Sequence, residues 1–163
     1  MTTRSVQVEP APVTIRVPFS AASVSIARTR LNNWLASAGG SRECIEDARV
    51  VVSELVANSV RHAQPLPDGK LTISWAIDAR GLEIAVTDGG APTRPRKIDA
   101  SPSALAGRGI SIIDTLSLSW WAERSRSRST VHAVLRLPDV AFPSWESDHA
   151  SKPDPSQQRP PVR

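Results

Sequence analysis

The chain has 163 residues, of which 40% are hydrophobic, 22% charged and 4% aromatic, and its formal net charge is +4. This composition fits one soluble domain; no apolar run approaches the roughly 20 residues of a membrane-spanning helix, and the modest charge argues against direct nucleic-acid binding. A single cysteine, Cys44, excludes an internal disulfide and a cysteine-cluster zinc site. Without a signal-peptide pattern, we expect a cytoplasmic protein that does not bind membranes.

The composition divides the chain into a core and two tails. Residues 1–12 are short and polar, and residues 138–163 are rich in proline, serine and charge. Such segments bury too little apolar surface to offset the entropy lost on ordering. We therefore predict disordered tails at 1–12 and 138–163, and one folded domain over residues 13–137.

The first half of this domain predicts a strand followed by two helices. Residues 13–18 alternate between apolar and polar as in a short strand, and residues 21–38 carry apolar side chains at helical spacing. Ser20 is expected to cap the first helix. Ser41 is expected to cap the second, which runs to about Ala63.

The second half predicts four strands and one short helix. The strands form two pairs, 71–77 with 82–87 and 118–123 with 130–137. Between the pairs lie an aperiodic loop over 88–106 and a helix over 110–116. Helices and strands are grouped rather than alternating. This order favours an α+β sandwich with a mixed, mostly antiparallel sheet over a Rossmann fold.

The second helix carries a polar motif beside its buried stripe. Glu54, Asn58 and His62 stand four residues apart and so share one face. The carboxamide of Asn58 is a neutral oxygen ligand suited to Mg²⁺, and the carboxylate of Glu54 could orient or deprotonate a nucleophile. The plainer interpretation is an amphipathic helix with polar residues at its edge and His62 as a structural histidine.

Two glycine motifs follow. Asp88 ends a strand and precedes Gly89 and Gly90, so the backbone can approach a flat ligand while the carboxylate accepts a hydrogen bond from an exocyclic amine. Further on, Gly107-Arg108-Gly109 begins a helix, where free N–H groups and the helix dipole favour phosphate, and Arg108 would add positive charge. Taken alone, the first motif is better explained as a common Asp-Gly turn, and a lone Gly-x-Gly is weak evidence.

The order and spacing of these motifs carry more information than each one. A Glu-x-x-x-Asn helix, a hairpin, an Asp-x-Gly strand end, a long loop and a Gly-x-Gly helix start together resemble the GHKL ATPase/kinase superfamily. The segment 54–63, Glu-Leu-Val-Ala-Asn-Ser-Val-Arg-His-Ala, most resembles the anti-sigma-factor serine kinases. The resemblance covers residues 13–137. It implies a two-layer Bergerat-type ATP-binding sandwich with helices on one face of the sheet.

The resemblance also implies roles for individual residues. Glu54 matches the catalytic base, Asn58 the Mg²⁺ ligand and Asp88 the residue that reads adenine. Residues 92–106 would form a lid over ATP. The residues that the resemblance places around the nucleotide are Asn58, Asp88, Gly90, Gly107, Gly109 and Thr130.

The implied function is that of an ATP- and Mg²⁺-dependent protein-serine kinase. It would phosphorylate a serine on a small antagonist protein and sequester a sigma factor, and family members often form homodimers. Pro92 and Ser129 stand where the family pattern has glycine. These departures keep open a non-catalytic module of the same fold, which would act by binding ATP or a protein alone. A detached histidine-kinase catalytic domain is a third reading, disfavoured because no phosphoacceptor helix pair precedes Val13.

Overall fold

Five strands and three helices make up the part of the chain that the computed structural model describes, residues 10–91 and 108–137. Side chains of residues 108–110 are outside this description. The elements, in chain order, are β1 (Val13–Pro18), α1 (Ser23–Ser37), α2 (Arg42–His62), β2 (Lys70–Asp78), β3 (Gly81–Asp88), α4 (Arg108–Leu116), β4 (Ser119–Arg124) and β5 (Ser129–Leu135). Residues 1–9 of the N-terminal tail expected at 1–12, the tail expected at 138–163 and the lid expected at 92–106 lie outside the described residues.

The strands form one sheet in the order β1-β2-β3-β5-β4. All four strand pairs are antiparallel, so the described sheet has none of the parallel pairing that a mixed sheet would contain. β3 occupies the centre of the sheet. Its register with β5 places Asp88 opposite Ser129 and Thr87 opposite Thr130. Successive strand residues face opposite sides of a sheet, so these two rows face opposite sides.

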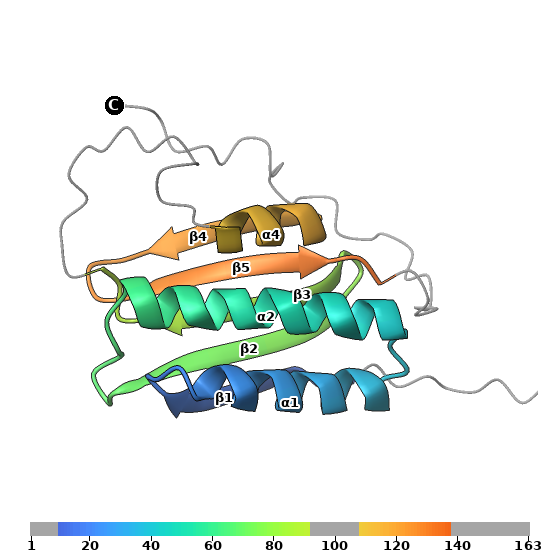
Figure 1. Cartoon of the computed structure of the whole chain (residues 1–163), viewed down its shortest axis with the longest axis horizontal. Helices are drawn as coiled ribbons and strands as arrows, with labels where there is room; N and C mark the ends of the chain where they lie inside the picture. The colour runs from blue at the N-terminus through green and yellow to red at the C-terminus, as the bar shows by residue number, and fades with distance from the viewer. Residues whose placement is uncertain (1–9, 92–107, 138–163) are drawn as a thin grey trace, which may run out of the picture.

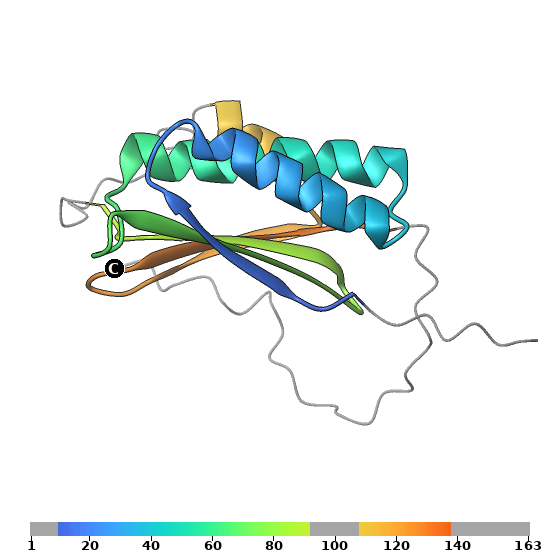
Figure 2. The same ribbon diagram turned by 90° about the horizontal axis from the view of Figure 1, so that it is seen from below.

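The three described helices cover one face of the sheet and leave the other open, which confirms the predicted α+β layering (Figures 1 and 2). Helix α2 packs against both α1 and α4. The hydrophobic core between the helices and the sheet contains every second residue of the central strands and the buried faces of the helices. Its largest fully buried side chains include Leu31, Leu35, Val52, Val56, Leu71, Ile73, Leu82 and Ile84. Burying each such side chain stabilises the fold by about 1.5–3 kcal/mol.

Helix α2 is the longest described helix, at 21 residues, and its start agrees with the sequence. The Ser41 hydroxyl oxygen accepts a hydrogen bond from the Cys44 N–H at 3.2 Å, as an N-cap should. Helix α1 differs from expectation. It starts after Ala22, which makes no side-chain cap, and Ser20 lies in the preceding turn. No helix in residues 10–91 or 108–137 has the length and hydropathy to cross a bilayer.

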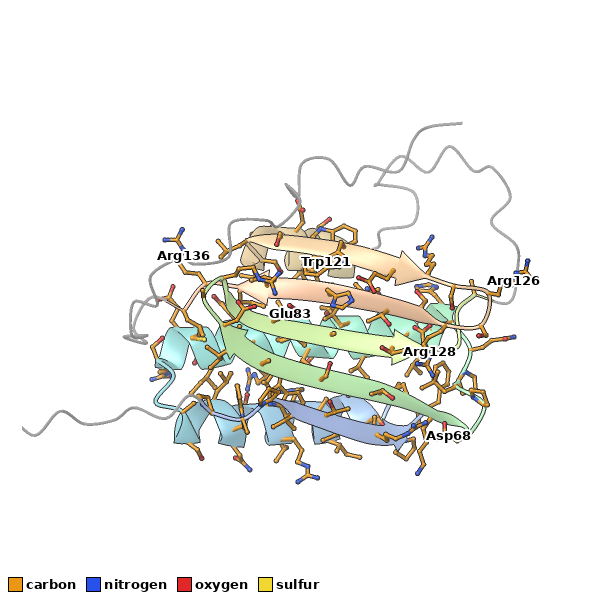
Figure 3. The ribbon with its side chains drawn as sticks, turned by 180° about the vertical axis from the view of Figure 1, so that it is seen from behind. Asp68, Glu83, Trp121, Arg126, Arg128 and Arg136 are labelled. Carbon is orange, nitrogen blue, oxygen red and sulfur yellow. The ribbon has the colours of Figure 1, made fainter. Side chains whose placement is uncertain are left out.

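The open face of the sheet is polar (Figure 3). Nδ1 of His132 on β5 lies 2.9 Å from Oε1 of Glu83 on β3, and the imidazole stacks on the indole of Trp121 with centroids 4.7 Å apart. The Arg80 guanidinium donates hydrogen bonds to the carboxylates of Asp78 and Glu83, and the bond to Asp78 in particular raises the pKa of Arg80 above its usual value. Trp120 faces the helices instead and donates from Nε1 to Asp114 of α4 at 3.1 Å.

Candidate functional site

A buried carboxylate lies where β3 ends. Asp88 is only 5% exposed. Its Oδ2 accepts a hydrogen bond from the Ser59 hydroxyl at 2.6 Å, and its Oδ1 accepts one from the Gly90 N–H at 2.8 Å. Within the described residues, no cationic side chain pairs with it. A carboxylate has about four lone-pair sites, so each oxygen keeps capacity to accept a further hydrogen bond.

Backbone hydrogen bonds join this strand end to the segment after α2. The Gln64 N–H donates to the Gly90 carbonyl at 2.9 Å, and the Gly89 N–H donates to the Gln64 carbonyl at 2.8 Å. Gly90 has φ of +81°, a conformation that side chains disfavour. A Cβ on Gly89 would lie 2.2 Å from the Pro65 carbonyl oxygen. The double glycine is therefore required by the backbone, and it fixes Asp88 against the end of α2.

The polar motif of α2 belongs to the same helix as Ser59, the residue whose hydroxyl contacts this carboxylate. Glu54 and Asn58 are both half-buried, and Asn58 directly precedes Ser59, whose hydroxyl contacts Asp88. Neither Glu54 nor Asn58 makes a side-chain hydrogen bond to another described residue. Half-buried polar groups without protein partners are available to a ligand. His62, one turn beyond, is exposed.

The third motif begins α4, which starts at Arg108 and packs against α2. Strand β4 follows α4 directly and runs back along it, and its last residue, Arg124, lies in the same row as Ser129 and Asp88. The first turn of α4 therefore lies toward the end of the sheet that carries Asp88 (Figure 1). Gly107 itself is outside the described residues, and for Arg108 and Gly109 only the helical backbone is described.

Basic residues lie at this same end of the sheet. The turn between β4 and β5 carries Arg126 and Arg128, both exposed (Figure 3). Arg61 is exposed in the last turn of α2. These charges raise the local potential, which favours an anionic ligand at this end of the fold.

Thr130 is not brought to the other predicted residues. Its hydroxyl lies 2.8 Å from that of Thr87. Thr87 precedes Asp88 on the same strand and therefore faces the opposite side of the sheet. On β5, the residue that shares the row and the face of Asp88 is Ser129. The structure thus places the Thr130 hydroxyl on the open face of the sheet, and its assignment to the nucleotide site stays a prediction.

The sequence did not single out Ser59 as a functional residue. Its only signal in the sequence is that a hydroxyl side chain stands in the buried face of the second helix, which otherwise consists of hydrophobic residues. The structure shows why it is there, because Ser59 is 5% exposed and donates to Asp88.

The side chains at this site suit a metal ion that takes most of its ligands from a bound molecule and water rather than from the protein. In the described part of the chain, no group of three or more His, Cys, Asp or Glu side chains could hold a metal ion. A single amide oxygen from Asn58 is compatible with Mg²⁺, which binds proteins through one or two side chains and takes phosphates and waters for its remaining positions. A hollow of about 160 Å³ elsewhere, on the open face between β1, β2 and β3, shares no residue with this site.

Comparison with known proteins identifies the family of the chain. Residues 17–135 match the model of the histidine kinase-like ATPase domain family. The chain is 34% identical over 116 residues to the serine-protein kinase RsbW of Listeria monocytogenes, a match that covers 64% of this chain and 74% of that protein. It is 36% identical over 80 residues to the serine-protein kinase RsbW of Staphylococcus aureus, covering 48% and 50%.

Two solved structures share the fold. The crystal structure of the RsbU and RsbW domains of Rv1364c from Mycobacterium tuberculosis superposes with a TM-score of 0.61 at 21% identity, covering 78% of this chain and 32% of that longer one. The crystal structure of the SiaB-SiaC complex from Pseudomonas aeruginosa gives a TM-score of 0.57 at 15% identity, covering 76% and 88%. The chain is a member of the histidine kinase-like ATPase domain family and a homologue of the RsbW serine-protein kinases.

Proposed function

We propose that this protein is an ATP- and Mg²⁺-dependent protein-serine kinase that phosphorylates a small antagonist protein and sequesters a sigma factor. The observation that supports this best is the carboxylate of Asp88. It is buried, it is held by two hydrogen-bond donors, and within the described residues no cation neutralises it. Buried charges of this kind are costly and are typical of ligand sites.

Asp88 is the proposed reader of the adenine base. Its remaining acceptor sites would receive the exocyclic amine, which guanine lacks at the same ring position. Gly89 and Gly90 have no side chains, so a flat base could approach the backbone closely at this strand end. The bound nucleotide would then extend its phosphates toward the first turn of α4, where backbone N–H groups favour anions.

Asn58 and Glu54 are the residues that we propose take part in phosphoryl transfer. The Asn58 amide oxygen would hold Mg²⁺, which when bound neutralises phosphate charge. Glu54 would accept the proton of the substrate serine as its oxygen attacks the γ-phosphorus. In that transfer the new serine O–P bond forms, the bond from the γ-phosphorus to the bridging oxygen breaks, and ADP leaves with the electron pair. Positioning and electrostatics account for most catalysis in this reaction class.

The partners are proposed from the names of the relatives and from the family resemblance. The Listeria and Staphylococcus homologues are named serine-protein kinases, which indicates a protein substrate bearing serine. A non-catalytic module of the same fold is the second candidate. It is favoured by Pro92 and Ser129, which replace glycines of the family pattern. We also propose that the protein forms a homodimer.

Calorimetric titration of the full chain with Mg-ATP tests the nucleotide site. We expect micromolar binding to the parent protein and at least about tenfold weaker binding to Asp88→Asn, which loses the charge of the acceptor. Asp68→Asn, an exposed aspartate bound to Arg16, is the matched control and should bind as the parent does. No heat from the parent protein would overturn the proposal.

Phosphotransfer separates the kinase from the non-catalytic module. The protein is used to capture its partners from a native cell lysate, with and without ATP, and the captured proteins are identified by mass spectrometry. Radiolabelled ATP is then added to the purified small partner. Labelling of a serine supports the kinase, whereas ATP binding without any transfer supports the module.

A further inference from the structure

Ser59 directs its hydroxyl away from its own helix. Helical serine and threonine commonly donate to the carbonyl four residues earlier. Three other helix hydroxyls in the described chain do so, namely Ser37, Ser53 and Thr115. Ser59 instead donates to Asp88, 29 residues later in the sequence. It is the side chain that links α2 directly to the carboxylate at the end of β3.

The bond is short and buried. It measures 2.6 Å, and Ser59 and Asp88 are each 5% exposed. Hydrogen bonds to an ionised acceptor are shorter and stronger than neutral ones, and they strengthen further where water is excluded. The second oxygen of Asp88 is held by the Gly90 N–H. Two donors from different segments therefore fix the rotation of the carboxylate plane.

We propose that Ser59 is a positioning residue for base recognition, which orients the Asp88 carboxylate toward the exocyclic amine of a 6-aminopurine nucleotide. The inference rests on the proposed nucleotide site and adds the origin of its base preference. Without the hydroxyl, Oδ2 loses its partner, and one donor alone, the Gly90 N–H, no longer fixes the rotation of the carboxylate plane. A 6-aminopurine then loses its advantage over a purine that has only hydrogen at the 6-position.

A purely structural role would give a different result. If Ser59 only holds α2 against β3, its loss should weaken all purine nucleotides by the same factor. The ratio of two affinities separates these cases, because a general loss of packing cancels from the ratio while a loss of amine recognition does not.

The test compares Mg-ATP with the Mg complex of purine riboside triphosphate, which lacks the amine. Dissociation constants are measured by calorimetry for the parent protein, Ser59→Ala and Ser53→Ala. The parent should prefer ATP by about tenfold, the size expected for one hydrogen bond to a charged acceptor. In Ser59→Ala the preference should fall to about twofold or less, mainly through weaker ATP binding. Ser53→Ala removes a hydroxyl from the same helix and should keep the parental ratio.

Ser59→Cys guards against misfolding of the alanine variant, since it nearly keeps the side-chain volume but is a poor donor. It should lose the same preference, with a parental circular dichroism spectrum. A parental ratio in a folded Ser59 variant would overturn the inference and leave the nucleotide site standing. Binding of neither nucleotide to the parent protein would overturn the proposed function and this inference with it.

Discussion

The backbone of Gly89 passes the Pro65 carbonyl so closely that a Cβ at residue 89 would lie 2.2 Å from the oxygen. This close approach, with the two hydrogen bonds between Gln64 and the double glycine, fastens the end of β3 to the segment after α2. The acceptor carboxylate and the polar face of α2 are thereby held in one fixed arrangement.

Gly89→Ala should disturb this arrangement. The added methyl group must displace backbone, which typically costs about 1–3 kcal/mol when a packed site is overfilled. We expect a lower free energy of unfolding in urea and weaker ATP binding. Gly39→Ala, just after α1, is the control and should bind ATP as the parent does, because its Cβ would meet nothing within 4 Å and only the positive φ is strained. A Gly89→Ala protein that binds ATP as tightly as the parent would show that this contact does not position the site.

Glu54→Gln should separate binding from chemistry. The change removes the proton acceptor but keeps the shape, so ATP affinity should stay within about twofold while transfer falls by about 10²–10⁴-fold, the usual contribution of a general base. Transfer is measured with radiolabelled ATP and the captured partner. Glu46→Gln alters an exposed residue of the same helix and should transfer normally. A parental rate in Glu54→Gln would remove Glu54 from its assigned role.

Thr130→Val should leave nucleotide affinity unchanged. Its hydroxyl bonds Thr87 on the open face, on the other side of the sheet from Asp88. Losing this half-buried hydrogen bond should lower stability by about 1 kcal/mol, visible in urea unfolding. A tenfold weaker ATP affinity in this variant, measured by calorimetry, would contradict this prediction and support Thr130 as a nucleotide-binding residue.

Ser41→Ala should destabilise the helix that carries the site. Removing an N-cap hydroxyl costs about 1 kcal/mol and should lower the melting temperature by about 4 °C for a domain of this size. Ser20→Ala is the contrasting variant, since α1 begins after Ala22 and no side-chain cap is made. Thermal unfolding followed by circular dichroism distinguishes them. Equal shifts in the two variants would contradict the assignment of Ser41 as the cap.

Local patterns predicted most of the fold. The strand at 13–18 has the expected bounds, and Ser41 caps α2 as expected, because alternation and capping depend on neighbouring residues. Trp120 and Trp121, as successive residues of one strand, face opposite sides of the sheet. Ser20 failed as a cap because the turn after β1 is closed by backbone bonds, and the Ser23 hydroxyl donates to the Pro18 carbonyl.

The site was predicted less completely, for a physical reason. Glu54, Asn58 and Asp88 were identified from residue type and spacing, and these remain assignments for the variants to test. Strand register is not local, and a shift of one residue moves a side chain to the other face. The family resemblance implied that Thr130 lies near the nucleotide, but the face of the sheet that it occupies follows only from the register. The Ser59–Asp88 bond spans 29 residues, and no short motif encodes such a contact.

The strand order also affects how readily native molecules aggregate through the edges of the sheet. β1 and β4 form the two edges of the sheet, and each has only six residues. Prolines at 12 and 18 bracket β1, while Glu123 and Arg124 place exposed charges at the end of β4. Short edges with proline or charge resist strand-to-strand aggregation between native molecules. Light scattering that rises on heating would therefore report unfolded chains rather than stacked native sheets.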